Sequence, residues 1–291
     1  MGDRSTRSET LGERLVLQSR QKNEAHFLEQ LLGREHLNLD VNTIPWIVNH
    51  IDCFVSQSQG NESVEHVFLR PYAFHGHNYD DWDKIGQAIV NLQSLDRLRI
   101  SSRQDYDDEY DDSDEDEDED EDSPIPDWEI VARILSHVRQ SVMVIFDGKR
   151  LRTVEEVHPF ARAIRGHPTI TSFVDRGMFP HESLDTLFSA LTTLPVLESV
   201  TLGAPEITQV DESTLAYPES MTELLRVPTL RFVRFKNFSF TRALLQALAN
   251  ALIEGTAVIR LEFSECSFSA EESTAILANA LSRNASVVTI S

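Results

Sequence analysis

Hydrophobic residues recur along the chain in one spacing, with apolar side chains at positions i, i+3, i+5 and i+10. The spacing is clearest in three stretches: Leu197, Val200, Leu202 and Ile207; Leu230, Val233, Phe235 and Phe240; and Val258, Leu261, Phe263 and Phe268. It predicts a short strand followed by a loop that turns back into the core. A unit of this size cannot bury its own apolar face, so we expect copies to stack into an elongated solenoid.

The pattern begins eight times when the sequence is aligned on position i. These starting residues are Val64, Leu95, Ser141, Ile170, Leu197, Leu230, Val258 and Val287, and every copy has an apolar residue at i+3. Successive copies lie 27 to 33 residues apart, except for an interval of 46 residues between Leu95 and Ser141. We interpret the excess as an insertion between one strand and the next helix.

Segments with helical periodicity separate these strands. Their apolar residues recur every three or four positions, as in Trp82, Ile85, Ile89 and Leu92, or Leu244, Leu245, Leu248 and Leu252. Each segment therefore has one apolar face that can pack on a sheet. Alternating strands and helices make the strands parallel, so we expect an α/β solenoid that curves with its strands on the concave face and its helices on the convex face.

The first 59 residues contain no clear copy of the pattern. Leu28, Leu31 and Leu32 end an amphipathic helix, and Thr43 and Pro45 mark the start of another. We expect residues 1–59 to form a helical cap, residues 60–104 the first repeats, residues 105–124 an acidic insertion and residues 125–291 the remaining repeats. The sequence ends in a strand without a C-terminal cap, for which an incomplete reading frame and an edge covered by self-association or another partner are the two explanations.

The repeats resemble those of the leucine-rich repeat proteins, specifically the ribonuclease-inhibitor-like class with strand-helix units of about 28 residues. The closest stretch is 258–287, where Cys266 occupies the Asn/Cys position of the family pattern and Phe268 its last leucine. Elsewhere the repeats depart from the pattern, and Asp175 replaces an apolar i+5 residue. The resemblance covers about residues 60–291 and implies a solenoid whose concave face binds proteins.

Charge is concentrated in one segment. The net charge is −22, and residues 105–122 contain fifteen carboxylates without lysine or arginine, so the rest of the chain carries −7. Such a segment repels itself and buries little apolar surface, which predicts disorder. The acidity argues against nucleic-acid partners. Within this segment, Ser113 with Asp116 three residues later matches the preference of acidophilic kinases, so we expect phosphorylation of Ser113.

Motifs for catalysis are missing from the sequence. It contains no phosphate-binding glycine motif, no G-x-S-x-G and no His-Glu-x-x-His, so we expect no enzyme activity. His75, His77 and Asp81 have a spacing compatible with a metal, but solvated turn residues are the favoured interpretation. We therefore expect no metal site and no cofactor.

The strand register also predicts which side chains face out of the sheet. A basic cluster with one aromatic residue consists of Arg231, Phe232, Arg234, Lys236 and Arg260. A second basic place lies earlier in the chain and consists of Arg97 and Arg99. Arginine and aromatic side chains are common anchors of protein interfaces. The alternative is a solvated charged face.

We therefore expect a non-enzymatic scaffold that binds protein partners through its concave face, with the acidic insertion as a second interaction or autoinhibitory element. The alternative is a histone-binding or small-GTPase-regulating factor that uses the acidic segment against basic partners. No apolar run approaches the roughly 20 residues that span a bilayer, so we expect no membrane partner. Two cysteines far apart indicate buried thiols in a reducing compartment, the cytoplasm or alternatively the nucleus.

Overall fold

Parallel strands and helices alternate through the whole computed structural model, which describes residues 26–39, 43–70, 79–101, 128–147, 151, 153–204, 218–268 and 273–290. A nine-stranded sheet has the order β1-β2-β3-β4-β5-β6-β7-β9-β11. Its strands are β1 (His36–Leu39), β2 (His66–Leu69), β3 (Arg97–Ser101), β4 (Val142–Asp147), β5 (Ile170–Asp175), β6 (Ser199–Gly203), β7 (Phe232–Lys236), β9 (Arg260–Ser264) and β11 (Thr289–Ile290). Every pairing between neighbours in this sheet is parallel.

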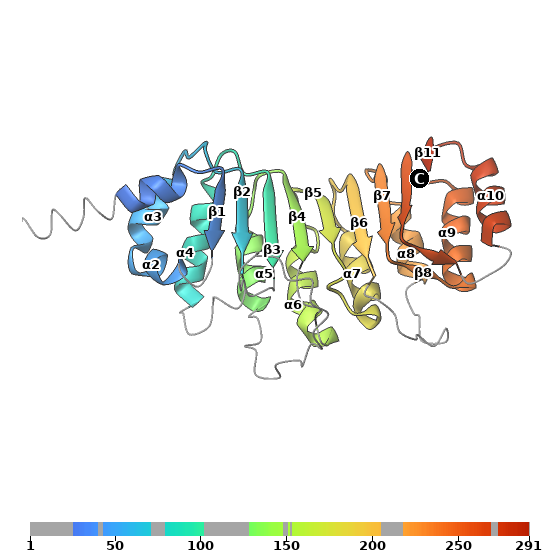
Figure 1. Ribbon diagram of the computed structural model, residues 1–291, viewed down its shortest axis with the longest axis horizontal. Coiled ribbons are helices and arrows are strands. Elements are labelled where there is room, and N and C mark those ends of the chain that lie inside the picture. The colour runs from blue at the N-terminus through green and yellow to red at the C-terminus, as the bar shows by residue number, and fades with distance from the viewer. Residues whose placement is uncertain are drawn as a thin grey trace, which may run out of the picture.

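The helices form a second layer along one face of the sheet (Figure 1). They are α2 (Ile44–Asn49), α3 (Ile51–Ser58), α4 (Tyr79–Val90), α5 (Trp128–His137), α6 (Val154–Ile164), α7 (Leu184–Leu191), α8 (Pro218–Leu225), α9 (Arg242–Glu254) and α10 (Ser273–Arg283). From α3 onward, helices that follow one another in this order pack side by side. Packed helices lie about 8–10 Å apart and parallel strands only about 4.8 Å, so the strand layer takes the concave side.

The strand register predicted from the sequence is confirmed. The i+3 residues of all eight copies form one continuous row across the sheet: Val67, Leu98, Val144, Phe173, Val200, Val233, Leu261 and Ile290. All but Ile290, which lies in the outermost strand β11, are at most 1% exposed. This row, together with the apolar faces of the helices, makes a single continuous hydrophobic core.

The i+10 position of the pattern is buried in the unit of β7, where Phe240 is fully buried, whereas Phe268 at the same position of the next unit is 38% exposed. Phe240 in β8 (Ser239–Phe240) pairs with Phe268 in β10 (Ser267–Phe268), and their rings stack with centroids 5.3 Å apart. Phe240 also meets Phe235 edge-on at 5.3 Å. After β7 the chain therefore turns back inward at Phe240, as the spacing predicts.

The N-terminal region differs from the expected helical cap. The helices at 26–32 and in α2 and α3 are present, but β1 lies between them and pairs with β2, so the sheet begins before residue 60. Pairing places Leu37 opposite Val67, which puts the polar Arg34 at position i. This copy departs from the pattern at position i, where Arg34 is polar and exposed.

Several expectations fall on residues that the structure does not describe. These are the acidic segment 105–122 with Ser113, and the histidines His75 and His77; Asp81 lies in α4. The expectation of two buried thiols is wrong for Cys53, which is exposed on α3. Among the described residues, none of the helices has the length and hydropathy needed to cross a membrane.

Candidate functional site

Two rows of outward-facing side chains run across the concave face of the sheet. The first row consists of His36, His66, Arg97, Met143, Ser172, Ser199, Phe232, Arg260 and Thr289. The second row consists of Asn38, Phe68, Arg99, Ile145, Val174, Thr201, Arg234 and Glu262. Parallel pairing in register brings residues 27 to 46 positions apart in sequence to within one strand spacing of each other.

The predicted basic cluster is assembled on β7 and β9. The guanidinium carbon of Arg260 lies 5.4 Å from the centre of the Phe232 ring, which is a cation–π arrangement. Arg260 Nε also donates a hydrogen bond of 2.6 Å to Glu262, and Arg234 Nε lies 3.5 Å from the other carboxylate oxygen of Glu262. Glu262 thus holds both arginines in fixed positions around the aromatic ring.

Two carboxylates make the cluster less basic than the sequence analysis assumed. Glu262 neutralises part of the arginine charge, and Lys236 Nζ lies 3.7 Å from Glu265. Arg231 donates through Nη1 to the backbone carbonyl of Ala257 at 3.0 Å, at the end of the sheet where the strands begin. The face is therefore a mixed surface of arginine, carboxylate and aromatic groups rather than a purely basic patch.

The second basic place is a similar arrangement around β3. Arg99 Nε donates a hydrogen bond of 2.5 Å to Asp147, and Arg176 Nη1 lies 3.6 Å from the same Asp147 oxygen. The Arg99 guanidinium carbon lies 5.5 Å from the centre of the Phe68 ring. Arg97 pairs with the neighbouring Asp96 at 3.3 Å and stays exposed. Each place therefore combines an arginine, a carboxylate and a phenyl ring.

A half-buried apolar strip separates the two places. Met143, Ile145 and Val174 face outward on β4 and β5 and are partly exposed. Arg99 and Arg234 occupy the same row four strands apart, which corresponds to about 19 Å at the spacing of a parallel sheet. Among the described residues, no helix packs on this side of the sheet, so both places and the strip are open to a partner.

The sequence analysis missed Phe68, Met143, Ile145 and the buried counter-charge Asp147. The register alone predicts the first three, because they occupy the i+2 or i+4 offsets of the copies that start at Val64 and Ser141. Asp147 is the last residue of β4, at i+6, an offset that the pattern does not constrain. Its 8% exposed side chain shows that the arginines cover it.

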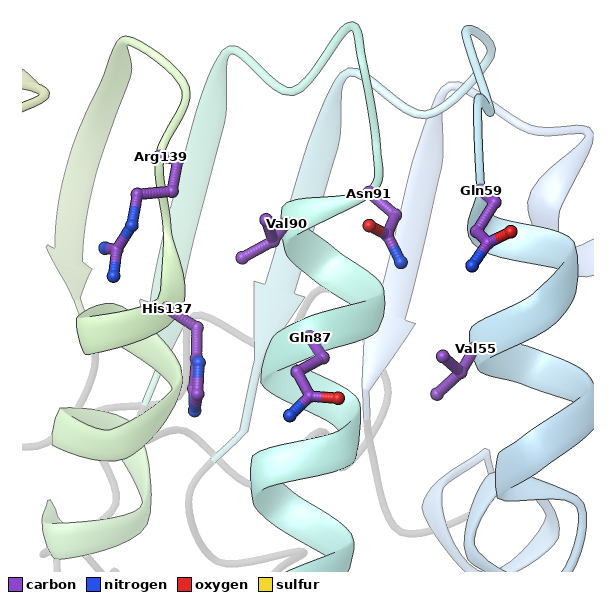
Figure 2. A pocket seen from close by; sticks show the side chains of 7 residues that line it. All are labelled: Val55, Gln59, Gln87, Val90, Asn91, His137 and Arg139. Atoms are coloured by element: carbon purple, nitrogen blue, oxygen red, sulfur yellow. The ribbon is translucent and has the colours of Figure 1, made fainter.

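The convex side has a different character. A groove of about 330 Å³ lies between the C-terminal parts of α3, α4 and α5, and Figure 2 shows the residues that line it: Val55, Gln59, Gln87, Val90, Asn91, His137 and Arg139. His137 Nε2 lies 3.5 Å from Asp83 on the same helix layer. The lining combines three amides with two valines, a histidine and an arginine, without a pair of groups arranged for proton transfer or nucleophilic attack.

Comparison with known proteins adds little beyond the fold. No family model matches the chain, and no curated protein matches it. A solved structure with a similar arrangement is the leucine-rich repeat-containing protein LegL7 from Legionella pneumophila, at 14% sequence identity and a TM-score of 0.47, with 88% of this chain and 73% of that chain covered. The fold assignment rests on the parallel sheet, the helix layer and the repeat register. These features give the chain an α/β solenoid fold like that of leucine-rich repeat proteins.

Proposed function

We propose that the protein is a non-enzymatic scaffold that binds a folded protein partner on its concave face. One observation carries the proposal: Arg260 on Phe232 and Arg99 on Phe68 flank a partly exposed apolar strip on a sheet face that no described helix covers. Interface hot spots are rich in arginine and aromatic residues, and their cores contain apolar groups that exclude water. A partner of complementary shape can contact both places at once.

Affinity purification with paired variants tests this proposal. The parent protein, a double variant Phe232→Ser with Arg260→Ser, and the convex control Arg162→Ser are used as baits, and the captured proteins are identified by mass spectrometry. Arg162 is exposed on α6, so its removal changes the charge without touching the concave face. We expect specific partners to bind the parent and Arg162→Ser and to be lost from the double variant.

The melting temperature of each bait separates loss of binding from loss of folding. Phe232 and Arg260 face outward, so the double variant should stay folded. Partners that bind all three baits equally would place the binding surface elsewhere on the molecule and would contradict the proposal.

The acidic segment supports a second binding role. Fifteen carboxylates in residues 105–122 can attract a basic partner, so the protein would then be a histone-binding factor or a factor that regulates a small GTPase. Retention of histones at physiological salt by the parent, and not by a protein without residues 105–122, would support this alternative. Attraction between exposed charges decays over about 8 Å at physiological salt, so binding that persists only at low salt would argue against it.

The same segment is also a candidate for autoinhibition of the concave face. It follows β3, and eighteen extended residues span up to about 60 Å, more than the distance from β3 to β7. Deleting it should then strengthen binding of acidic partners at low salt. The gain should vanish when Arg231, Arg234 and Arg260 are all replaced by serine, and unchanged affinity at both low and high salt would exclude the contact.

A further inference from the structure

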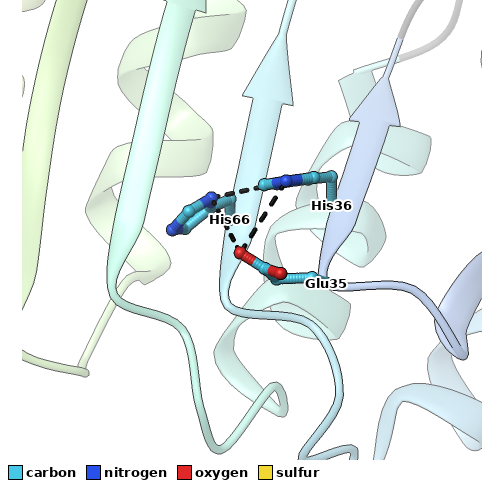
Figure 3. A group of neighbouring side chains, drawn as sticks. All are labelled: Glu35, His36 and His66. Atoms are coloured by element: carbon cyan, nitrogen blue, oxygen red, sulfur yellow. Dashed lines mark hydrogen bonds and ion pairs between the residues drawn. The ribbon is translucent and has the colours of Figure 1, made fainter.

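Glu35, His36 and His66 lie together at the N-terminal end of the concave face (Figure 3). β1 and β2 pair with His36 directly opposite His66, so both imidazoles project from neighbouring strands on the same side of the sheet. Glu35 immediately precedes β1, and its backbone carbonyl accepts hydrogen bonds from the amides of Glu65 and His66, each at 3.0 Å. The backbone of all three residues is thus held by the sheet.

The nitrogen and oxygen atoms of these side chains converge. The two Nδ1 atoms of His36 and His66 are 2.9 Å apart. Glu35 Oε1 lies 3.9 Å from His66 Nδ1 and 3.8 Å from His36 Nε2. When two Nδ1 atoms share a hydrogen bond, one carries the proton and the other offers a lone pair, so a cation that replaces this proton can bind both nitrogens.

We propose that Glu35, His36 and His66 bind a divalent transition-metal ion, for which Zn²⁺ has the best-matched ligand preference. Two histidines and one carboxylate are a known type of three-ligand zinc set, with Zn–N and Zn–O distances of about 2.0–2.2 Å. Tetrahedral ligand atoms at those distances are about 3.3 Å apart. One ligand atom from each of the three side chains lies within 4.8 Å of the other two, so the ligand atoms must move closer by at most about 1.5 Å. Side-chain rotation is sufficient, because the strands already place the residues.

The surroundings favour this site over an accidental pair of surface histidines. The edge of the His36 ring meets Phe68 at a centroid distance of 5.6 Å, which restricts rotation of that imidazole. The neighbouring cation on the same row, Arg97, is paired with Asp96 and so is partly neutralised. Glu35 and His36 have side chains more than half exposed, so the fourth coordination position is open to water or to a group of another molecule. The proposal does not depend on the proposed function.

Cobalt binding tests the site directly. Untagged full-length protein, freed of metal with a chelator, is titrated with Co²⁺, whose visible absorption is strong in a tetrahedral nitrogen and oxygen site. Excess Mg²⁺ is present to occupy carboxylates such as those of residues 105–122. Without Mg²⁺ these carboxylates would add weak Co²⁺ sites. We expect one equivalent of Co²⁺ to develop the tetrahedral spectrum, and Zn²⁺ to displace it.

Four variants decide between this site and others. His36→Gln and His66→Gln should each lose the spectrum, and Glu35→Gln should bind at least about tenfold more weakly. His158→Gln is the matched control, because His158 is an exposed histidine on α6 at the convex face; it should behave as the parent. Absence of a stoichiometric Co²⁺ spectrum in the parent, or an unchanged spectrum in His66→Gln, would overturn the proposal.

Discussion

The carboxyl group of Asp175 accepts a hydrogen bond of 2.8 Å from the backbone amide of Met178, and a second of 3.0 Å from Gly177. Asp175 ends β5 at an i+5 position, where most copies have an apolar residue, and is only 1% exposed. Its other oxygen, Oδ2, has no hydrogen-bond partner among the described residues. Burial outweighs the two hydrogen bonds and raises the pKa of Asp175 to about 8.

Replacing Asp175 with asparagine should remove a pH dependence of stability. The group loses its proton near pH 3.8 in the unfolded chain and near pH 8 in the folded protein, so the folded state binds more protons between these values. Stability of the parent should therefore fall as the pH rises from about 4 to about 8. Asparagine keeps the acceptor oxygen without a charge, so Asp175→Asn should become progressively more stable than the parent over that range.

Denaturant unfolding of both proteins at several pH values measures this effect. His167 is buried too, and desolvation lowers its pKa, but it titrates in both proteins and cancels in their difference. A constant difference between Asp175→Asn and the parent from pH 4 to pH 8 would show that Asp175 is ionised at neutral pH in the folded state.

The strand register makes a second prediction about stability. Val200 and Leu261 lie in the buried row, whereas Thr201 faces outward opposite Arg234. Val200→Asp and Leu261→Asp should each destabilise by more than about 3 kcal/mol, because each buries an unpaired charge. Thr201→Asp should change stability by no more than about 0.5 kcal/mol. Thermal melts of the three variants provide the comparison, and similar losses in all three would be incompatible with the register.

The repeat register could be predicted from sequence because burial imposes it on every copy. An i+3 residue such as Val200 is surrounded by core atoms on both neighbouring units, so only an apolar side chain is stable there. Position i tolerates exceptions, as with Arg34 before β1 and Ser141 before β4, which are both exposed. The first strand was therefore not predicted, because it lies among helices and its position i is polar.

The chemistry of the concave face was less predictable. Outward positions follow from the register, so the arginines and Phe232 could be named in advance. Their pairing with Glu262 and Asp147 depends on side-chain conformations and on which strands are adjacent, which spacing alone does not encode. His36 and His66 meet only because β1 joins the sheet, so the missed strand also concealed the proposed metal site.

Removing the charge of Glu262 should strengthen anion binding at the basic cluster. Glu262→Gln keeps the side chain's size and one acceptor oxygen but no longer neutralises Arg234 and Arg260. We expect a fluorescent oligoglutamate peptide to bind up to about fivefold more tightly at low salt, with little gain at high salt. Glu155→Gln removes one negative charge on α6, at the convex face, and serves as the control. An equal gain in peptide affinity in Glu155→Gln would mean that the peptide does not bind at the basic cluster.

Asn61 links neighbouring units through its side chain. Its Nδ2 donates to the backbone carbonyl of Leu32 at 2.9 Å, and its Oδ1 accepts from the amides of Ser63 at 3.1 Å and Val64 at 3.0 Å. Asn284 occupies the same offset, three residues before position i, and makes the equivalent bonds with Leu252, Ser286 and Val287. The two asparagines therefore join a helix end of one unit to the strand entry of the next.

Truncating Asn61 should lower the local stability of the N-terminal unit more than that of the rest of the solenoid. Asn61→Ala leaves the Leu32 carbonyl and the Val64 amide without their partner in a part-buried place, which should cost about 1–3 kcal/mol. Asn61→Asp keeps the acceptor but sets a carboxylate oxygen against the Leu32 carbonyl oxygen, so it should also destabilise. Hydrogen exchange of the β1 and β2 amides should accelerate more than that of β7, because each unit contacts mainly its neighbours. Uniform acceleration across the sheet would instead indicate that the solenoid unfolds as one cooperative unit.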